Sequence, residues 1–104
     1  MPRDAQGHLT PGRVSPKRSV PTSIARPEYV DRPEPAPYVG TNIYTPSEVE
    51  RIRRAGSIAA QAVEAVGATV APGVTTEELD VVAHEFLIAH RAYPSTLGYR
   101  GFPK

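Results

Sequence analysis

The chain has 104 residues, of which 39% are hydrophobic and 22% are charged, and its formal net charge is +1. This length allows one small domain. The chain contains no cysteine, which excludes disulfide bonds and thiolate metal sites within it. No apolar run approaches the ~20 residues of a membrane-spanning helix. We therefore expect a soluble, cytoplasmic protein without membrane contact.

Residues 1–40 differ from the rest of the chain, because they contain eight of its twelve prolines. Proline lacks a backbone donor and has a fixed φ, so this stretch is unsuited to a helix or a central strand. Its apolar residues are few and scattered, which leaves little surface to offset the entropy of ordering. We expect a disordered extension over residues 1–40 and a folded part over residues 41–104.

The extension is also basic. Residues 1–26 carry five basic side chains and one aspartate, a net charge of +4, whereas residues 27–104 carry −3. A flexible basic segment on a mildly acidic body can be a contact for nucleic acid or for the ribosome. The simpler alternative is a solubilising tail without a fixed partner, because five basic residues in 26 form only a weak charge run.

The first predicted helix covers about residues 46–66. Thr45 can cap it, Pro46 suits the first helical position, and Glu48 can complete a capping box. Gly67 is a candidate helix end. Apolar residues then recur at helical spacing, and they would form one buried stripe. These residues are Val49, Ile52, Ala59, Val63 and Val66.

A second helix is predicted at about residues 76–90, where Thr75 and Glu78 form another capping box. One face is apolar, and Val81 and Ile88 lie on the opposite face. A helix with two apolar faces needs cover on both, and this chain offers little to supply it. We therefore expect the chain to fold poorly alone and to represent part of a larger fold.

The three histidines do not indicate a metal site. His84-Glu85 resembles the start of a helical zinc motif, but that motif needs a second histidine at position 88, which is isoleucine. We interpret His84 as a surface residue among acids. His90 lies near the end of the second helix, where the helix dipole favours it, and His8 lies in the extension.

Three segments together resemble the type I methionine aminopeptidases, in particular the extended bacterial members. Residues 42–56 read NIYTPSEVERIRRAG, residues 70–80 read VAPGVTTEELD, and residues 92–104 read AYPSTLGYRGFPK. The resemblance implies the α+β pita-bread fold, in which two α/β halves form a curved sheet with helices outside. This chain would supply two helices and the start of the first strand. It would be an N-terminal fragment of the catalytic domain.

The resemblance further implies removal of initiator methionine from nascent peptides by a protein that is monomeric when intact. The family uses two divalent metal ions (Co, Mn, Fe or Zn), held by two aspartates, one histidine and two glutamates, and the metal-bridging water attacks the peptide. Those ligands follow the segment that ends at Lys104, so none maps here and the fragment is expected to be inactive. Alternatives are a ribosome-docking or interaction module, or a catalytically dead relative.

Part of the methionine side-chain pocket does map onto this sequence. Tyr99 and Phe102 match its aromatic wall, and Thr96 matches a position that often holds cysteine. Such residues would enclose an unbranched thioether; otherwise these aromatics are ordinary core. Arg100 stands where histidine is common in the family, which removes any polar contact specific to that histidine.

Overall fold

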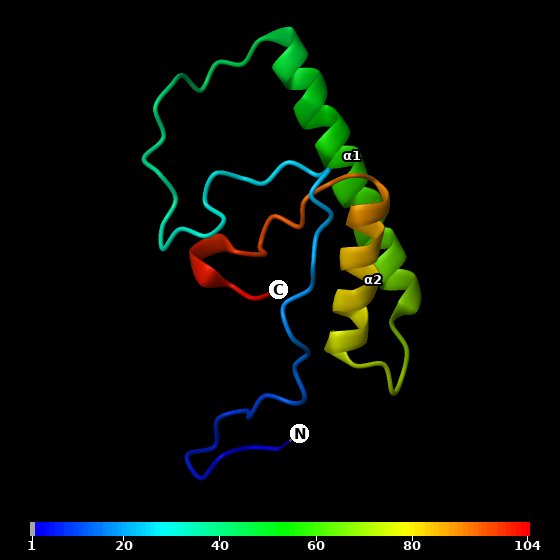
Figure 1. The fold of residues 1–104 in the computed structure, drawn as a ribbon. Helices are drawn as coiled ribbons and strands as arrows, with labels where there is room; N and C mark the ends of the chain where they lie inside the picture. Colours follow the sequence, from blue (N-terminus) through cyan, green and yellow to red (C-terminus); the bar gives the residue numbers. More distant parts are fainter. Residues whose placement is uncertain (1) are drawn as a thin grey trace.

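The structure is a computed structural model and describes residues 2–104. Its elements are helix α1 (Pro46–Thr69), helix α2 (Thr76–Ala89) and a short 3-10 helix η1 (Tyr99–Gly101). The two helices pack against each other as a hairpin, and the amino-terminal half of α1 extends beyond α2 (Figure 1). Residues 18–24 pass beside α2, between α2 and the carboxy-terminal segment (Figure 1).

The capping box predicted for α1 is confirmed. The Thr45 hydroxyl accepts a hydrogen bond from the Glu48 amide at 3.3 Å, and the Glu48 carboxylate accepts one from the Thr45 amide at 3.0 Å. The predicted end at residue 66, with Gly67 as the stop, is three residues too early. Gly67 keeps a negative φ, and the helix continues to Thr69. Glycine in a helix interior costs about 1 kcal/mol but does not have to end the helix.

The apolar stripe predicted on α1 is only partly covered. Val66 is half-buried against α2, but Ile52 is 53% exposed and Val63 is 73% exposed. The positions that lose solvent contact instead lie on the face of α1 turned to α2. They are Ile58, Ala62, Ala65, Val66 and Thr69.

Helix α2 matches its prediction to within one residue. Thr75 and Glu78 form the expected capping box, with the Glu78 amide donating to the Thr75 hydroxyl at 3.1 Å and the Thr75 amide donating to the Glu78 carboxylate at 2.6 Å. The helix ends at Ala89, and His90 is its C-cap. Both helix starts therefore follow from side chains within four residues of each other.

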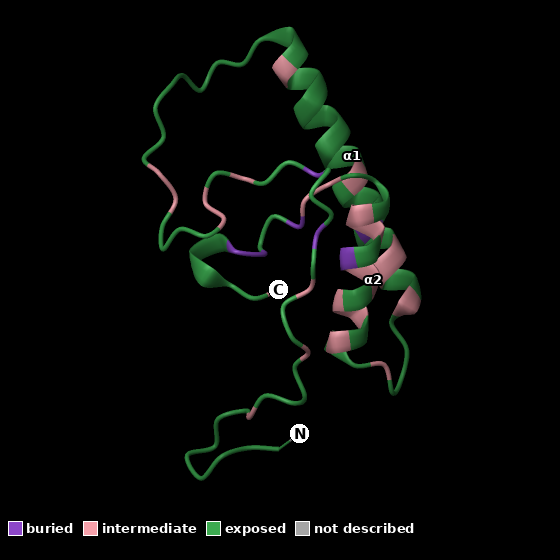
Figure 2. Ribbon diagram, viewed as in Figure 1, coloured by how far each residue is buried: buried purple, intermediate pink, exposed green. Residues whose placement is uncertain are grey.

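The expectation of disorder does not describe residues 15–30, which we call the strap. This segment has no regular secondary structure, as its prolines predict, but it packs along α2 and runs in the same direction (Figure 1). Val20 and Ile24 are buried with Leu97, and Ile88 of α2 packs against them. Figure 2 shows buried positions of the strap, of α2 and of the carboxy-terminal segment in one region. A few well-placed apolar residues thus order a segment whose average composition predicts disorder.

The strap also supplies the cover that α2 needs on its second face. Arg18 pairs with Glu77 at 2.5 Å and with Asp80 at 3.0 Å, about two to three helical turns before Ile88 meets the buried cluster. The expectation that this chain offers little to cover the second face is therefore wrong at Ile88, which packs against the chain's own buried cluster, whereas Val81 on the same face stays 37% exposed. The sequence did not indicate that the proline-containing extension provides the cover.

His84 is not a surface residue, contrary to the sequence interpretation. It is 7% exposed and is the buried polar side chain of the described residues. Its Nε2 lies 2.9 Å from the carbonyl oxygen of Ser19. A carbonyl can only accept, so Nε2 carries the proton and donates to the strap backbone. This hydrogen bond gives the Nε2–H group of the buried imidazole an acceptor in the strap that covers it.

Acidification is expected to loosen the strap. The hydrogen bond from Ser15, followed by the charges of Lys104 and Arg18, holds the pKa of Glu77 below its usual value of 4.5. A carboxylate with a lowered pKa in the folded state stabilises that state above pH 4.5, and the stabilisation is lost as pH falls through the lowered pKa. Titration of the Glu77 carboxyl carbon by NMR, beside the Ser19 amide shift, measures this. Glu77→Gln should remove the step, and a Glu77 pKa at or above 4.5 would contradict it.

No strand is present in the part of the chain that the structure describes, so the predicted start of a first strand is not found. Residues 93–104, which we call the pocket loop, instead contain η1. A strand requires a neighbouring strand to pair its backbone groups, and residues 2–104 provide none. Neither of the two described α-helices is long and apolar enough to cross a membrane.

Candidate substrate pocket

The pocket loop is a tight, internally hydrogen-bonded turn. The Gly98 amide donates to the Phe102 carbonyl at 2.7 Å, and the Phe102 amide donates to the Tyr99 carbonyl at 2.9 Å. Gly98 has φ 83° and Gly101 has φ 78°, which is the left-handed region that glycine enters without a steric penalty. The two glycines therefore allow the chain to fold back so that side chains three residues apart face one another.

The structure brings Thr96, Tyr99 and Phe102 together around one surface hollow of about 600 Å³. Tyr99 is 43% exposed and Phe102 is 52% exposed, so neither ring is ordinary core in the described residues. The Thr96 hydroxyl donates to the Lys104 carbonyl at 2.9 Å, which joins the two ends of the loop. These contacts bring the three residues together, and their binding of a substrate side chain stays a prediction.

Arg100 lies at the rim of the same hollow. Its backbone adopts φ 48° and ψ 37°, a left-handed conformation that is unusual for a residue with a side chain. The guanidinium lies 5.8 Å from the centre of the Tyr99 ring, within the range of a cation–π contact. Arg100 thus contacts the Tyr99 ring and leaves the hollow a positive rim.

The strap supports the pocket loop from behind, which sequence reasoning missed. The Tyr29 ring meets Tyr99 edge-on, with centroids 5.2 Å apart and planes at 82°. Val30 faces Gly98, where an added Cβ would lie 3.6 Å from the Val30 methyl groups. A signal was present, because Val20, Ile24, Tyr29 and Val30 recur within eleven residues of a segment otherwise poor in apolar side chains.

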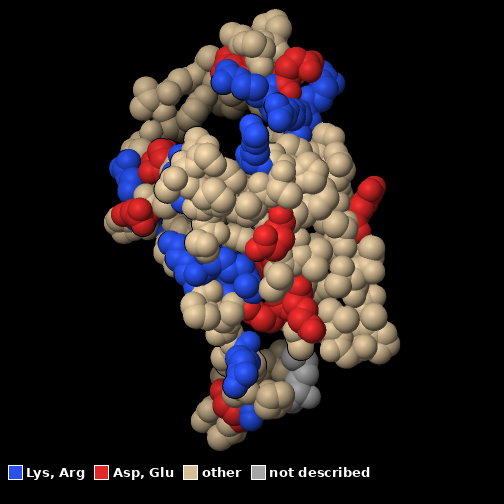
Figure 3. All heavy atoms as spheres, turned by 45° about the vertical axis from the view of Figure 1, so that its right-hand side comes forward, with Lys and Arg blue, Asp and Glu red and all other residues tan. Residues whose placement is uncertain are grey.

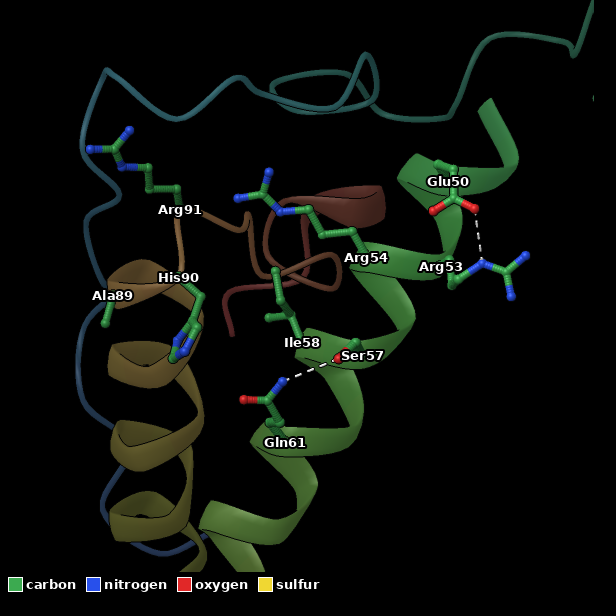
Figure 4. A pocket seen from close by; sticks show the side chains of 9 residues that line it. All are labelled: Glu50, Arg53, Arg54, Ser57, Ile58, Gln61, Ala89, His90 and Arg91. Carbon is green, nitrogen blue, oxygen red and sulfur yellow. Dashed lines mark hydrogen bonds and ion pairs between the residues drawn. The ribbon is translucent and has the colours of Figure 1, made fainter. Parts of the chain in front are cut away.

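A second hollow, of about 720 Å³, lies between the amino-terminal half of α1 and the end of α2. Figure 4 shows Arg54 and Arg91 reaching toward the same side of it, while Arg53 turns away to pair with Glu50 at 3.2 Å. Its lining is mixed, with charged and polar side chains beside Ile58 and Ala89. We assign it no ligand.

The residues present do not fit a two-metal centre. Within residues 2–104, no three histidine, aspartate or glutamate side chains come together in an arrangement that could hold a metal ion. His84 donates to a backbone carbonyl, and Glu77 and Asp80 are paired with Arg18. Figure 3 likewise shows acidic and basic side chains side by side on the face in view.

No family model matches the chain. Similarity to individual proteins is extensive. The chain is 55% identical over 96 residues to Methionine aminopeptidase 2 of Mycobacterium tuberculosis, which covers 92% of the chain and 34% of that protein. It is 44% identical over 97 residues to Methionine aminopeptidase 1D, chloroplastic/mitochondrial, of Arabidopsis thaliana, covering 92% and 28%. It is 38% identical over 112 residues to Methionine aminopeptidase 1D, mitochondrial, of Dictyostelium discoideum, covering 98% and 26%.

The similarity includes the extension. An alignment that covers 92% of 104 residues leaves about eight of them outside, so most of residues 1–40 must lie within it. The chain spans about a third or less of the length of the relatives that it matches. Along nearly its whole length, therefore, this chain is a homologue of methionine aminopeptidases.

Proposed function

We propose that these residues are part of a longer type I methionine aminopeptidase of the extended kind, which removes initiator methionine from nascent proteins. The observation that carries this proposal is the 55% identity over 92% of the chain to a protein of that name. The chain spans about a third of that relative, so the activity belongs to the complete protein. The gathering of Thr96, Tyr99 and Phe102 around one hollow supports the assignment of the pocket.

In this proposal the hollow receives the methionine side chain. The rings of Tyr99 and Phe102 offer apolar surface, and Thr96 closes the side between them. A flexible thioether gains favourable contacts with aromatic rings and fills an irregular space well. The pocket would therefore select an unbranched apolar side chain by enclosure, without a charged partner at its base.

The remainder of the proposed enzyme would cover apolar surface that these residues leave open. Ile43 is 83% exposed, Val63 is 73% exposed and Ile52 is 53% exposed, which is costly for a surface in water. A pita-bread fold has a sheet whose outer face carries helices, and such a sheet could cover α1. Two divalent metal ions are part of the family's chemistry, no three donor side chains of residues 2–104 come together in an arrangement that could hold one, and we assign no reaction step to this chain.

The 104-residue chain is expected to release no methionine from a Met-Ala-Ser peptide with Mn²⁺ or Co²⁺, because it lacks a metal donor set among its described residues. The full-length protein is expected to release it, and a chelator should abolish the release. Chromatography of the free amino acid measures both. Metal-dependent release of methionine by the 104-residue chain would contradict our proposal that the metal-dependent hydrolysis is carried out by residues of the full-length protein outside this chain. A full-length protein that releases none would contradict the proposed function.

Ribosome docking through residues 1–40 is a second proposal. The structure limits which basic residues of this stretch are available to bind the ribosome. Arg18 pairs with Glu77 and Asp80, and Arg26 donates to strap carbonyls. The exposed basic residues left for a partner in this stretch include Arg13 and Lys17. Salt-sensitive co-sedimentation with ribosomes, lost in an Arg13→Gln, Lys17→Gln double variant, would support docking, and unchanged sedimentation would reject it.

A further inference from the structure

Tyr29 contacts the pocket loop at two points. Its hydroxyl donates a hydrogen bond to the carbonyl oxygen of Ser95, and its ring meets the Tyr99 ring edge-on at 5.2 Å. Ser95 directly precedes Thr96, so the two contacts hold the two ends of the turn at residues 95–99, which includes two of the three pocket residues, Thr96 and Tyr99. An edge-to-face aromatic pair has a preferred geometry, and a hydrogen bond to a carbonyl is directional. Together they define the position of this turn.

The strap residues that precede Tyr29 are themselves held in place by hydrogen bonds and by the buried cluster. The Arg26 guanidinium donates to the carbonyls of Pro21 at 2.6 Å, Ile24 at 2.8 Å and Val20 at 2.5 Å, which closes the backbone before Tyr29 into a compact turn. Two of these three residues, Val20 and Ile24, belong to the buried cluster with Leu97. The turn is therefore anchored on the same core that underlies the pocket loop.

Neighbouring contacts also hold Tyr29 and the pocket loop in fixed positions relative to each other. Val30 packs over Gly98, and the Tyr93 hydroxyl donates to the Leu97 carbonyl at 2.9 Å. Burial, followed by the proximity of Tyr93 and Tyr99, raises the pKa of Tyr29, so its hydroxyl keeps its proton and remains a donor at neutral pH. Tyr29 thus makes its contact to Ser95 as a neutral donor throughout the physiological range.

We infer that Tyr29 is a positioning residue of the candidate pocket, holding the Tyr99 wall and the Ser95–Thr96 turn in the geometry that encloses an unbranched side chain. The inference rests on the proposed function for its substrate. Tyr29 does not line the hollow, so it acts through Tyr99 and Ser95. If the Tyr99 ring is held in a fixed position, a branched side chain in the hollow would overlap with it sterically. If the ring can move, the hollow can accommodate the branched side chain. Tyr29 therefore contributes to selectivity as well as to affinity.

The experiment uses the full-length protein with Tyr29→Phe and Tyr29→Ala. Tyr29→Phe keeps the ring and removes the bond to Ser95, and Tyr29→Ala removes both contacts. Tyr38→Phe is the matched control, since Tyr38 lies in the same extension, is 67% exposed and donates its hydroxyl hydrogen bond to the nearby Thr41 carbonyl. KM for Met-Ala-Ser is expected to rise about fivefold in Tyr29→Phe, as for one lost hydrogen bond, and tenfold or more in Tyr29→Ala.

The kinetic pattern separates positioning from other roles. The pocket binds a side chain that does not itself react, so its loosening should change KM while kcat stays within about twofold. The preference for Met-Ala-Ser over Leu-Ala-Ser should fall in both Tyr29 variants and stay constant in Tyr38→Phe. An unchanged KM and an unchanged preference in Tyr29→Phe would overturn the inference. If Tyr29→Ala fails to fold, Tyr29→Phe alone decides.

Amide hydrogen exchange tests the inference without relying on activity. Tyr29→Phe should accelerate exchange of the Gly98 and Phe102 amides, whose hydrogen bonds close the pocket loop, and should leave the amides of α2 unchanged. Unchanged exchange at Gly98 and Phe102 would overturn the inference. Equal acceleration throughout α2 would assign Tyr29 a general stabilising role and would also overturn it. A wild-type protein that releases no methionine would reject the proposed function, and exchange would still decide the role of Tyr29.

Discussion

Replacing Leu97 by alanine is expected to destabilise the packing between strap and pocket loop by about 2–5 kcal/mol. Leu97 is 2% exposed, which makes it the most deeply buried large side chain of the described residues. Its neighbours come from the strap (Val20 and Ile24), from α2 (Ile88) and from the pocket loop (Tyr93). Three separate segments cannot all collapse into the space that the missing methyl groups leave, so the cavity term adds to the lost transfer free energy.

Native-state hydrogen exchange of the full-length protein measures this effect. The Leu97 amide donates to Pro94 at 3.0 Å and the Ile24 amide donates to Pro21 at 3.1 Å, so both report opening of the cluster. Val39→Ala is the control, because Val39 is 93% exposed and its truncation should change stability by less than about 0.5 kcal/mol. A Leu97→Ala effect no larger than that of Val39→Ala would show that Leu97 does not join the strap to the loop.

Replacing Ile24 by aspartate is expected to release the strap from α2, with a loss of about 3–5 kcal/mol of local stability. Ile24 is 7% exposed and lies in the buried cluster. The substitution removes its apolar contacts and places a carboxylate where no partner is available, and both effects destabilise the docked state. A surface segment opens with less free energy than the whole protein, so a loss of this size should leave most molecules undocked.

Limited trypsin digestion of the full-length protein tests the release. Arg18 is held by Glu77 and Asp80 in the docked strap, and cleavage after it should accelerate at least tenfold in Ile24→Asp. Val14→Asp adds the same charge to the same extension at a position that is 58% exposed, and it should leave cleavage after Arg18 unchanged. Equal cleavage rates in the two variants would show that Ile24 does not hold the strap.

Both helices could be predicted from the sequence because their signals are local. The pairs Thr45 with Glu48 and Thr75 with Glu78 each lie three residues apart, and capping acts within one turn. The pocket residues share this property, since Thr96, Tyr99 and Phe102 span seven residues and two glycines turn the chain between them. The resemblance named these three residues, and the local loop geometry then brings them around one hollow.

The strap could not be predicted, because its partners are far away in the sequence. Arg18 and Glu77 are 59 residues apart, Ser19 and His84 are 65 apart, and Tyr29 and Ser95 are 66 apart. Composition averages over a segment, whereas docking depends on a few side chains that find complementary positions elsewhere. His84 shows the same limit, since its acidic neighbours indicated a surface position while the strap that buries it lies near the other end of the chain.

The sequence by itself determined where the helices start, which turn carries the aromatic side chains, and that α2 needs cover on two faces, because each of these depends on residues within about two helical turns. Only the tertiary structure decided that the proline-containing extension provides that cover and that Tyr29 stands behind Tyr99. The physical reason is that docking costs the conformational entropy of a flexible segment and gains buried apolar surface and paired charges. Whether the gain exceeds the cost depends on distant residues, whose positions only the tertiary structure gives.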